Sequence, residues 1–271
     1  NWITHSSADF KKYTDQVSYG LMAKGISPGD KIAIISNNRP EWNFTDLGVL
    51  QIGAIDVPVY PTISENDLKF ILTDADVKIV FVSTEELFLK VKNIAENLPL
   101  KPLIYTYNRV NGAPHWTELL ETGEKSKDEN KLNQLKEAIQ TGDLATLLYT
   151  SGTTGNPKGV MLSHANLVSN FISVQHLPPV KAGDKVLSFL PLNHIYERML
   201  TYLYMYLCTS IYYAESMETI GDNIREVQPT AFSAVPRLLE KVYDKIVAKG
   251  ADLTGIKKKL FFWALELGLK Y

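Results

Sequence analysis

The sequence lacks several features that would assign it early to a class of protein. Cys208 is the single cysteine among 271 residues, which excludes an internal disulfide framework and favours a reducing compartment such as the cytoplasm. The apolar run around Cys208 predicts a small, buried side chain. No apolar run reaches the roughly 18 residues of a membrane-spanning helix, and the N-terminus has no signal-peptide pattern. A net charge of −2 gives no electrostatic argument for nucleic-acid binding.

Several common site patterns are absent as well. The Walker phosphate loop needs Gly-Lys-Ser/Thr, but here Lys158 follows Pro157 and precedes Gly159. The chain has neither the glycine pattern of a dinucleotide site nor the signature of a serine or cysteine nucleophile. His194 and Glu197 stand three residues apart, yet no other histidine supplies the second pair that a dinuclear carboxylate site requires. Metal ligation by His194 is therefore disfavoured.

What is present is a composition that can build a core, with 45% hydrophobic and 21% charged residues. β-branched segments alternate with amphipathic ones in the first half. Strands are predicted at 31–35, 55–60, 77–82 and 103–107, and helices at 6–24, 40–53, 64–73 and 84–97. Ser6 and Asp9 have the spacing of a capping box at the first helix. This alternation predicts right-handed crossovers and a largely parallel sheet with helices on both faces.

The second half repeats the alternation after a polar stretch, 118–140, which predicts a solvated helix and loop. Strands are predicted at 143–149, 184–190, 209–214 and 229–235, and helices near 164–175, 193–207, 216–227 and 236–249. We therefore predict an α/β fold of two helix-flanked, mainly parallel β-sheet subdomains. The first subdomain and its charged linker would occupy residues 1–141, and the second, incomplete one residues 142–271.

The most specific segment is YTSGTTGNPKGVMLSH, residues 149–164, between a predicted strand and a predicted helix capped by Ser163. Glycines let the backbone turn sharply and bring its N–H groups close to a ligand, and successive N–H groups form a concave anion site. Hydroxyls add donors, and a lysine adds a mobile charge suited to phosphate. The segment predicts a phosphate-binding loop, with at least one of Gly152 and Gly155 at positive φ or close to phosphate. Its binding residues are Thr150, Ser151, Gly152, Thr153, Thr154, Gly155, Asn156, Pro157, Lys158 and Gly159.

This segment closely resembles the signature loop of the AMP-forming (adenylate-forming) superfamily, which includes acyl- and aryl-CoA ligases, luciferases and peptide-synthetase adenylation domains. Residues 189–198 (FLPLNHIYER) and 229–242 (PTAFSAVPRLLEKV) resemble the next motifs in the form seen in long-chain fatty-acyl-CoA synthetases. Residues 37–42 and 53–61 match the same subgroup. The resemblance covers nearly the whole chain.

The resemblance implies a long-chain fatty-acid–CoA ligase that uses ATP, Mg²⁺ and coenzyme A as co-substrate. Fatty acid and ATP would give acyl-AMP, from which coenzyme A would displace AMP. Lys158 and His194 would be the catalytic residues, and Thr153 would reach the magnesium ion. Asn193, His194 and Tyr196 would line the acyl pocket. A carboxylic acid, with a pKa of about 4, is already ionised at neutral pH, so positioning and charge stabilisation suffice without a base.

The same resemblance implies adenine-, ribose- and magnesium-binding motifs, a hinge and a catalytic lysine further downstream, and none is found before Tyr271. The first residue, Asn1, is not a methionine. We therefore expect a piece of a longer protein, inactive without its own C-terminal part. Two alternatives remain: a ligase of the superfamily for medium-chain or aryl acids, and a non-catalytic module that binds a nucleotide or a partner.

The cluster Lys257, Lys258 and Lys259 precedes an apolar, aromatic segment. Such a cluster is compatible with peripheral contact to an anionic membrane, where a fatty substrate would arrive. The favoured interpretation is a helix whose buried face has lost its partner.

Overall fold

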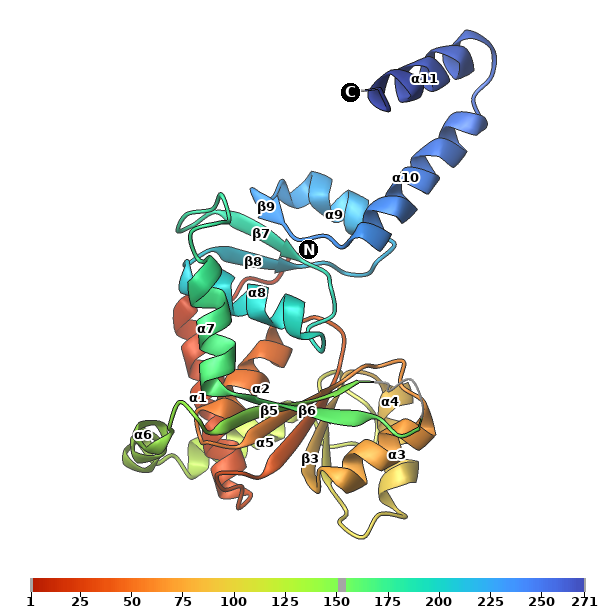
Figure 1. Cartoon of the computed structure of the whole chain (residues 1–271). Coiled ribbons are helices and arrows are strands. Elements are labelled where there is room, and N and C mark those ends of the chain that lie inside the picture. The colour runs from red at the N-terminus through yellow and green to blue at the C-terminus, as the bar shows by residue number, and fades with distance from the viewer. Residues whose placement is uncertain (1, 151–154, 271) are drawn as a thin grey trace. The chain divides into compact units, whose positions relative to one another are not determined.

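The computed structural model describes residues 2–150 and 155–270. The chain divides into two compact units, one ending at Ala231 and one beginning at Phe232, and each is described by itself. Figure 1 shows the course of the chain and the labels of its elements.

A six-stranded sheet forms the centre of the first unit, in the order β4-β3-β1-β2-β5-β6. Strands β1 to β5 run parallel, and β6 pairs antiparallel with β5. All five residues of β2 are buried, as expected of a sheet covered on both faces. The predicted mainly parallel sheet is confirmed. The strands are β1 (Lys31–Ile35), β2 (Ile55–Val59), β3 (Val77–Val82), β4 (Leu103–Thr106), β5 (Leu144–Thr150) and β6 (Lys158–Ser163).

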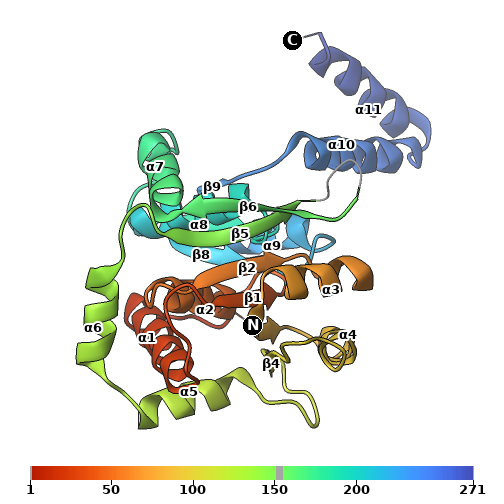
Figure 2. The same ribbon diagram turned by 60° about the horizontal axis from the view of Figure 1, so that its bottom comes forward.

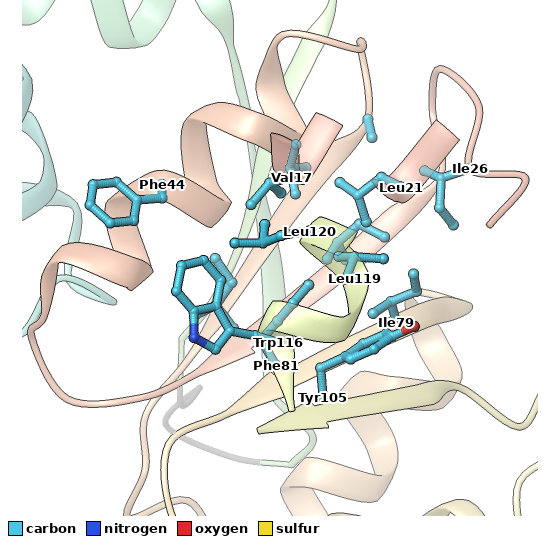
Figure 3. Packing of buried hydrophobic residues seen from close by; sticks show 14 of the residues in the cluster. Val17, Leu21, Ile26, Phe44, Ile79, Phe81, Tyr105, Trp116, Leu119 and Leu120 are labelled. Atoms are coloured by element: carbon cyan, nitrogen blue, oxygen red, sulfur yellow. The ribbon is translucent and has the colours of Figure 1, made fainter. Parts of the chain in front are cut away.

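Two hydrophobic cores lie on opposite faces of this sheet, because successive side chains of a strand point to opposite sides. In β1, Ile32 and Ile34 join one core, and Ala33 and Ile35 join the other. The first core packs against α1 (Ser7–Ala23), α2 (Pro40–Leu50) and α5 (Trp116–Lys125), and the second against α3 (Glu65–Asp74) and α4 (Glu85–Ala95). Figure 3 shows side chains of the first core directed toward one another from α1, α5 and β3.

Helix α1 begins as predicted. The N–H of Asp9 donates to the Ser6 hydroxyl at 3.1 Å, and the N–H of Ser6 donates to the Asp9 carboxylate at 2.9 Å. Helix α5 crosses α1 closely because both helices have a glycine at the contact. A Cβ on Gly20 would lie 2.5 Å from the Leu119 carbonyl oxygen, and one on Gly123 would lie 2.5 Å from the Gly20 nitrogen. The polar stretch forms two helices, α5 and α6 (Glu129–Ala138), rather than one helix and a loop.

A smaller sheet has the order β8-β7-β9, with β7 (Lys185–Ser188), β8 (Ser210–Tyr213) and β9 (Ala231–Phe232). Strands β7 and β8 pair in parallel. Helices α7 (His164–Val174), α8 (Ile195–Tyr206) and α9 (Ile220–Val227) follow the predicted segments. The cluster of Val186, Leu200, Leu203 and Tyr204 joins β7 to α8.

The division of the chain differs from the predicted boundary after residue 141. Strands β5 and β6, assigned by prediction to the second subdomain, complete the first sheet because β5 pairs with β2 at Asp56 and Thr146. The sequence does not predict strand β6, because its residues lie in the segment that is predicted to form the phosphate loop. Cys208 also differs: it is exposed, with φ of +55°, in the turn between α8 and β8. The apolar run around it consists of those two elements, and the cysteine takes the left-handed position that often ends a helix.

The second unit consists mainly of α10 (Pro236–Ala251) and α11 (Gly255–Gly268). The helices meet where Gly250 lies against the ring of Phe261, so that a methyl group at Gly250 would overlap the ring. Many large apolar side chains of this unit are exposed, among them Leu239, Ile246, Leu260 and Trp263. None of the described helices is both long enough and apolar enough to cross a bilayer.

A buried charge cluster around Arg198 joins α8 to the first sheet and to the helix α2. The guanidinium has no exposed surface; it lies 2.5 Å from Asp46 of α2 and 3.1 Å from Asp56 of β2. It also donates to the Thr146 hydroxyl of β5 at 2.8 Å and to the Tyr202 hydroxyl at 2.8 Å. Burial raises the pKa of Asp56, and Arg198 opposes that rise. These contacts fix α8 against α2, β2 and β5.

We predict that Arg198→Met destabilises the protein by about 3–5 kcal/mol, because it leaves buried carboxylates without their cation. Urea unfolding followed by circular dichroism measures the change. Arg225→Met is the matched control, since Arg225 pairs with Asp222 at the surface, where both side chains are more than three-quarters exposed. Equal shifts in the two variants would contradict a structural role for the buried cluster.

Candidate functional site

A cavity of about 800 Å³ opens where β2 and β5 end. Ligands of α/β proteins bind at the carboxyl ends of the strands, so this is the expected place for a site. Its walls come from the segment after β2, from α3, from the β5–β6 hairpin and from the starts of α7 and α8. The lining residues are Tyr60, Thr62, Ile63, Asp67, Ile71, Leu148, Tyr149, Thr150, Pro157, Val160, Leu162, Asn166, Leu167, Asn170, Asn193, His194, Ile195, Tyr196 and Met199.

The predicted phosphate loop is the connection of an antiparallel hairpin. Thr150 pairs with Lys158, and Tyr149 pairs with Gly159; Figure 2 shows β5 and β6 side by side. Ser151, Gly152, Thr153 and Thr154 lie outside the described residues, so their predicted roles, including the contact of Thr153 with magnesium, stay predictions.

The glycines of this loop have different roles. Gly155 has φ of +98°, which confirms the prediction that at least one of Gly152 and Gly155 takes a left-handed backbone. Gly159 was predicted to belong to the turn of the loop. This prediction is wrong, because Gly159 lies within β6. A Cβ there would lie 3.2 Å from Cζ of Tyr149. Gly159 therefore leaves room for the tyrosine ring.

The base of the loop carries a hydroxyl and a cation on one face. Side chains of residues directly opposite in an antiparallel pair share a face, so Lys158 and Thr150 leave the hairpin on the same side. Thr150 and Pro157 line the cavity, and Thr150, Asn156 and Lys158 are exposed. Lys158 itself is not among the lining residues, but its exposed ammonium lies on the same face as the lining hydroxyl of Thr150, and the two together can stabilise an anion.

The residues predicted for the acyl pocket, Asn193, His194 and Tyr196, line the same cavity. Asn193 is buried, and its amide donates to the Val59 carbonyl at 2.5 Å, which holds the start of α8 against the end of β2. His194 caps α8, since its Nδ1 accepts the N–H of Tyr196 at 3.3 Å. The neutral ring then carries its hydrogen on Nε2, where it can donate to an anion.

The sequence reasoning missed several lining residues. Tyr60 and Thr62 follow β2 directly, so the rule that ligands bind beyond strand ends would have found them. Asn166 and Asn170 lie four residues apart on one face of α7. Tyr149 belongs to the motif itself, but its side chain was given no role. No sequence signal identifies Met199.

Behind the cavity, hydrogen bonds hold the segment 188–194 in place. The side-chain N–H of Asn38 donates to the Ser188 hydroxyl at 3.0 Å, and the Leu192 N–H donates to the side-chain oxygen Oδ1 of Asn38 at 3.0 Å. Ser188 in turn donates to Glu197 at 2.6 Å. Glu197 is only 2% exposed, and burial raises its pKa to about 7.

No group of three or more His, Cys, Asp and Glu residues among the described residues could hold a metal ion. Magnesium prefers octahedral oxygen ligands and keeps several waters, and it commonly binds through substrate phosphates. A magnesium ion that arrives on a nucleotide would not require such a group.

Comparisons with known proteins show which proteins this chain is similar to. A model of the AMP-binding enzyme family matches residues 1–267. The long-chain-fatty-acid--CoA ligase ACSBG2 of Homo sapiens is 31% identical over 277 residues, covering 97% of this chain and 41% of that protein. The long chain acyl-CoA synthetase 6, peroxisomal, of Arabidopsis thaliana is 31% identical over 269 residues, covering 96% of this chain and 38% of that protein. The chain thus spans about two fifths of the length of these curated relatives.

Solved structures share the fold. The inhibitor-bound N-terminal domain of FACL13 from Mycobacterium tuberculosis matches with a TM-score of 0.71 at 23% identity, over 88% of this chain and 57% of that one. The long-chain-fatty-acid-CoA ligase FadD1 from Archaeoglobus fulgidus matches with a TM-score of 0.75 at 23% identity, over 92% of this chain and 49% of that one. These likenesses confirm the α/β fold class.

We predict that Glu197→Gln removes a pH dependence of stability. The folded-state pKa of about 7 lies above the ordinary value of 4.5, so the stability contributed by the protonated form is complete at low pH. It is lost as the pH rises toward 7, because the unfolded chain has then released the proton. Glutamine cannot ionise, and its amide oxygen can still accept from Ser188.

The measurement is the urea midpoint of the wild type and the variant at about pH 5 and about pH 8. The variant should gain stability relative to the wild type at the higher pH. Glu226→Gln, at an exposed carboxylate of α9, controls for the loss of charge alone. A difference between Glu197→Gln and the wild type that stays constant with pH would contradict the prediction.

Proposed function

Because this chain belongs to the AMP-binding enzyme family, we propose that the protein activates a long-chain fatty acid with ATP and transfers it to coenzyme A. The observation that carries the proposal is the shared cavity, which the base of the phosphate loop and the predicted acyl-side residues both line. The identity of about 30% to proteins named long-chain fatty-acid–CoA ligases supports the class of substrate. The proposal concerns the whole protein, since the chain spans only part of its relatives' length.

The cavity has the polarity that such a substrate requires. Polar groups of the lining come from Thr62, Asp67, Thr150, Asn166, Asn170, Asn193 and His194, while Ile63, Ile71, Leu148, Val160, Leu162, Leu167 and Met199 supply apolar surface. The apolar surface favours a hydrocarbon chain, and the polar groups can fix the orientation of its charged end. In this proposal, Nε2–H of His194 donates to the carboxylate of the acid.

The proposed first step joins an oxygen of the fatty-acid carboxylate to the α-phosphorus of ATP and breaks the bond to the bridging oxygen of the leaving pyrophosphate. The carboxylate is the nucleophile and needs no base, since the pKa of the acid is about 4. Lys158 and Thr150 stabilise the phosphate charge, together with Ser151, Gly152, Thr153 and Thr154. Thr153 would contact a magnesium ion carried by ATP, and this ion would neutralise further phosphate charge.

In the proposed second step the thiol of coenzyme A attacks the acyl carbonyl, the thioester forms and AMP leaves. The first step is tested by ATP/pyrophosphate exchange with the full-length protein and acids of graded chain length. We expect the fastest exchange with long-chain acids. Preference for a medium-chain or aryl acid would indicate another ligase of the family. Absence of exchange with every acid would favour a non-catalytic nucleotide- or partner-binding module.

We predict that Lys158→Ala slows acyl-AMP formation by the full-length protein about a hundredfold, since removal of one such charge contact costs roughly 3 kcal/mol in the transition state. The pyrophosphate exchange rate measures the effect. Lys181→Ala is the matched control, because Lys181 is likewise an exposed lysine but lies outside the β5–β6 hairpin that carries the phosphate loop. An exchange rate in Lys158→Ala equal to that of the control would remove Lys158 from the mechanism.

We also predict that the 271 residues alone form no acyl-CoA. Phosphate contacts open to water are far weaker than those in a closed site, and the chain is much shorter than its relatives. The assay is incubation of the purified chain with palmitate, Mg-ATP and coenzyme A, followed by thioester detection. Turnover above that of the same chain carrying Lys158→Ala would overturn this prediction.

A further inference from the structure

Tyr149 connects the phosphate-loop hairpin to a helix of the first sheet. It stands in β5 directly before Thr150, and its hydroxyl donates to the carboxylate of Asp74 at 2.6 Å. Asp74 is the last residue of α3 and lies 75 residues earlier in the chain. This bond joins the end of β5 to α3 beside the cavity that Tyr149 lines.

The ring of Tyr149 also covers the partner strand. Tyr149 and Gly159 are paired in register, and a Cβ on Gly159 would lie 3.2 Å from Cζ and 3.5 Å from the hydroxyl oxygen. An aromatic ring over a cross-strand glycine protects the backbone of that glycine. Phe70 of α3 meets the ring edge-on, with 6.4 Å between centroids. One side chain therefore contacts β6 and α3 together.

The position of Asp74 indicates that this contact compensates for a local cost. A negative charge at the C-terminal end of a helix is unfavourable because it meets the negative end of the helix dipole. The short bond from a hydroxyl to an ionised carboxylate offsets that cost. Partial burial and the nearby Asp74 raise the pKa of Tyr149, so its hydroxyl remains a donor at neutral pH.

Strand β6 depends on such a contact because it lies at the edge of the sheet and pairs only with β5. Its residues Lys158, Gly159, Val160 and Met161 are exposed. A small displacement of the hairpin would carry Thr150 and Lys158 away from the place where phosphate must lie. Displacements of about 1 Å can cost an enzyme on the order of a hundredfold in rate.

We propose that Tyr149 and Asp74 are positioning residues that clamp the β5–β6 hairpin to α3 and so fix Thr150 and Lys158 relative to the cavity. The clamp acts on the adenylation step and rests on the function proposed above. According to this proposal, the rate of adenylation depends on the hydroxyl–carboxylate pair as well as on the phosphate-binding residues.

The test uses the full-length protein with Tyr149→Phe, Asp74→Ala, the double variant and Asp74→Asn. Phenylalanine keeps the ring over Gly159 and removes only the hydroxyl. We expect kcat of pyrophosphate exchange to fall about threefold to tenfold in each single variant, as for the loss of one ordinary, solvent-exposed hydrogen bond. The KM for the fatty acid should stay unchanged, and the double variant should lose no more than either single one. Asp74→Asn keeps an acceptor and should retain more activity than Asp74→Ala.

Tyr107→Phe is the matched control. The hydroxyl of Tyr107 donates to the Thr45 hydroxyl at 2.8 Å inside the first core, away from the hairpin. This variant loses one tyrosine hydrogen bond and should lower the thermal midpoint while leaving kcat unchanged. An unchanged kcat in Tyr149→Phe, or losses that multiply in the double variant, would overturn the clamp.

Hydrogen exchange of the β6 amides separates failure of the clamp from failure of the proposed function. Tyr149→Phe should accelerate exchange in β6 and Tyr107→Phe should not, whether or not the protein turns over. If the wild type forms no acyl-AMP with any acid, the proposed function fails. The hydrogen-exchange measurement on β6 then decides by itself whether the clamp exists. Equal β6 exchange in the wild type and Tyr149→Phe would refute it.

Discussion

The arrangement of the site depends on the buried charge cluster around Arg198. The carboxylates of Asp46 in α2 and Asp56 in β2 both lie beside the guanidinium of Arg198 in α8. The arginine side chain has no exposed surface. A buried charge is tolerated only where its partners are close and its hydrogen bonds are made. The start of α8, which carries His194 and Tyr196, therefore has a fixed position over the end of β2. This cluster therefore fixes the side of the cavity that α8 forms.

The two walls of the cavity are held by different physical means. The α8 side is fixed by buried ions and by the hydrogen bonds of Asn38 and Asn193. The hairpin side lies at the sheet's edge, where β6 is largely exposed. The hairpin at the edge of the sheet is held less firmly than α8. The position of the hairpin therefore limits how precisely the residues of the site are arranged. Contacts between the hairpin and α3 therefore have a larger effect on geometry than their modest burial implies.

Much of the fold could be predicted from the sequence because its signals are local. The capping box of Ser6 and Asp9 and the apolar run of β1 each lie within a few residues. The hairpin strand β6 could not be predicted, since Lys158 and Gly159 read as loop residues and become a strand only by pairing with β5. The same holds for the boundary of the first sheet and for the carboxylate partners of Arg198, Asp46 and Asp56, which lie about 150 residues away along the chain. Of the cavity lining, the motifs predicted Thr150, Pro157, Asn193, His194 and Tyr196, but neither the remaining lining residues nor the hydrogen bonds that position them.

The mixed direction of the first sheet has a consequence for the order of folding. Its parallel strands pair only after a crossover has closed a long loop, whereas β5 and β6 need only the short connection between them. Hairpins form in about 1–10 μs, and contacts that are distant in sequence form more slowly. The segment that carries the phosphate loop can thus acquire its pairing early, before the sheet that supports it is complete. In that order of events, the register between β5 and β6 is set within the hairpin, and the hairpin then pairs with β2 as a preformed unit.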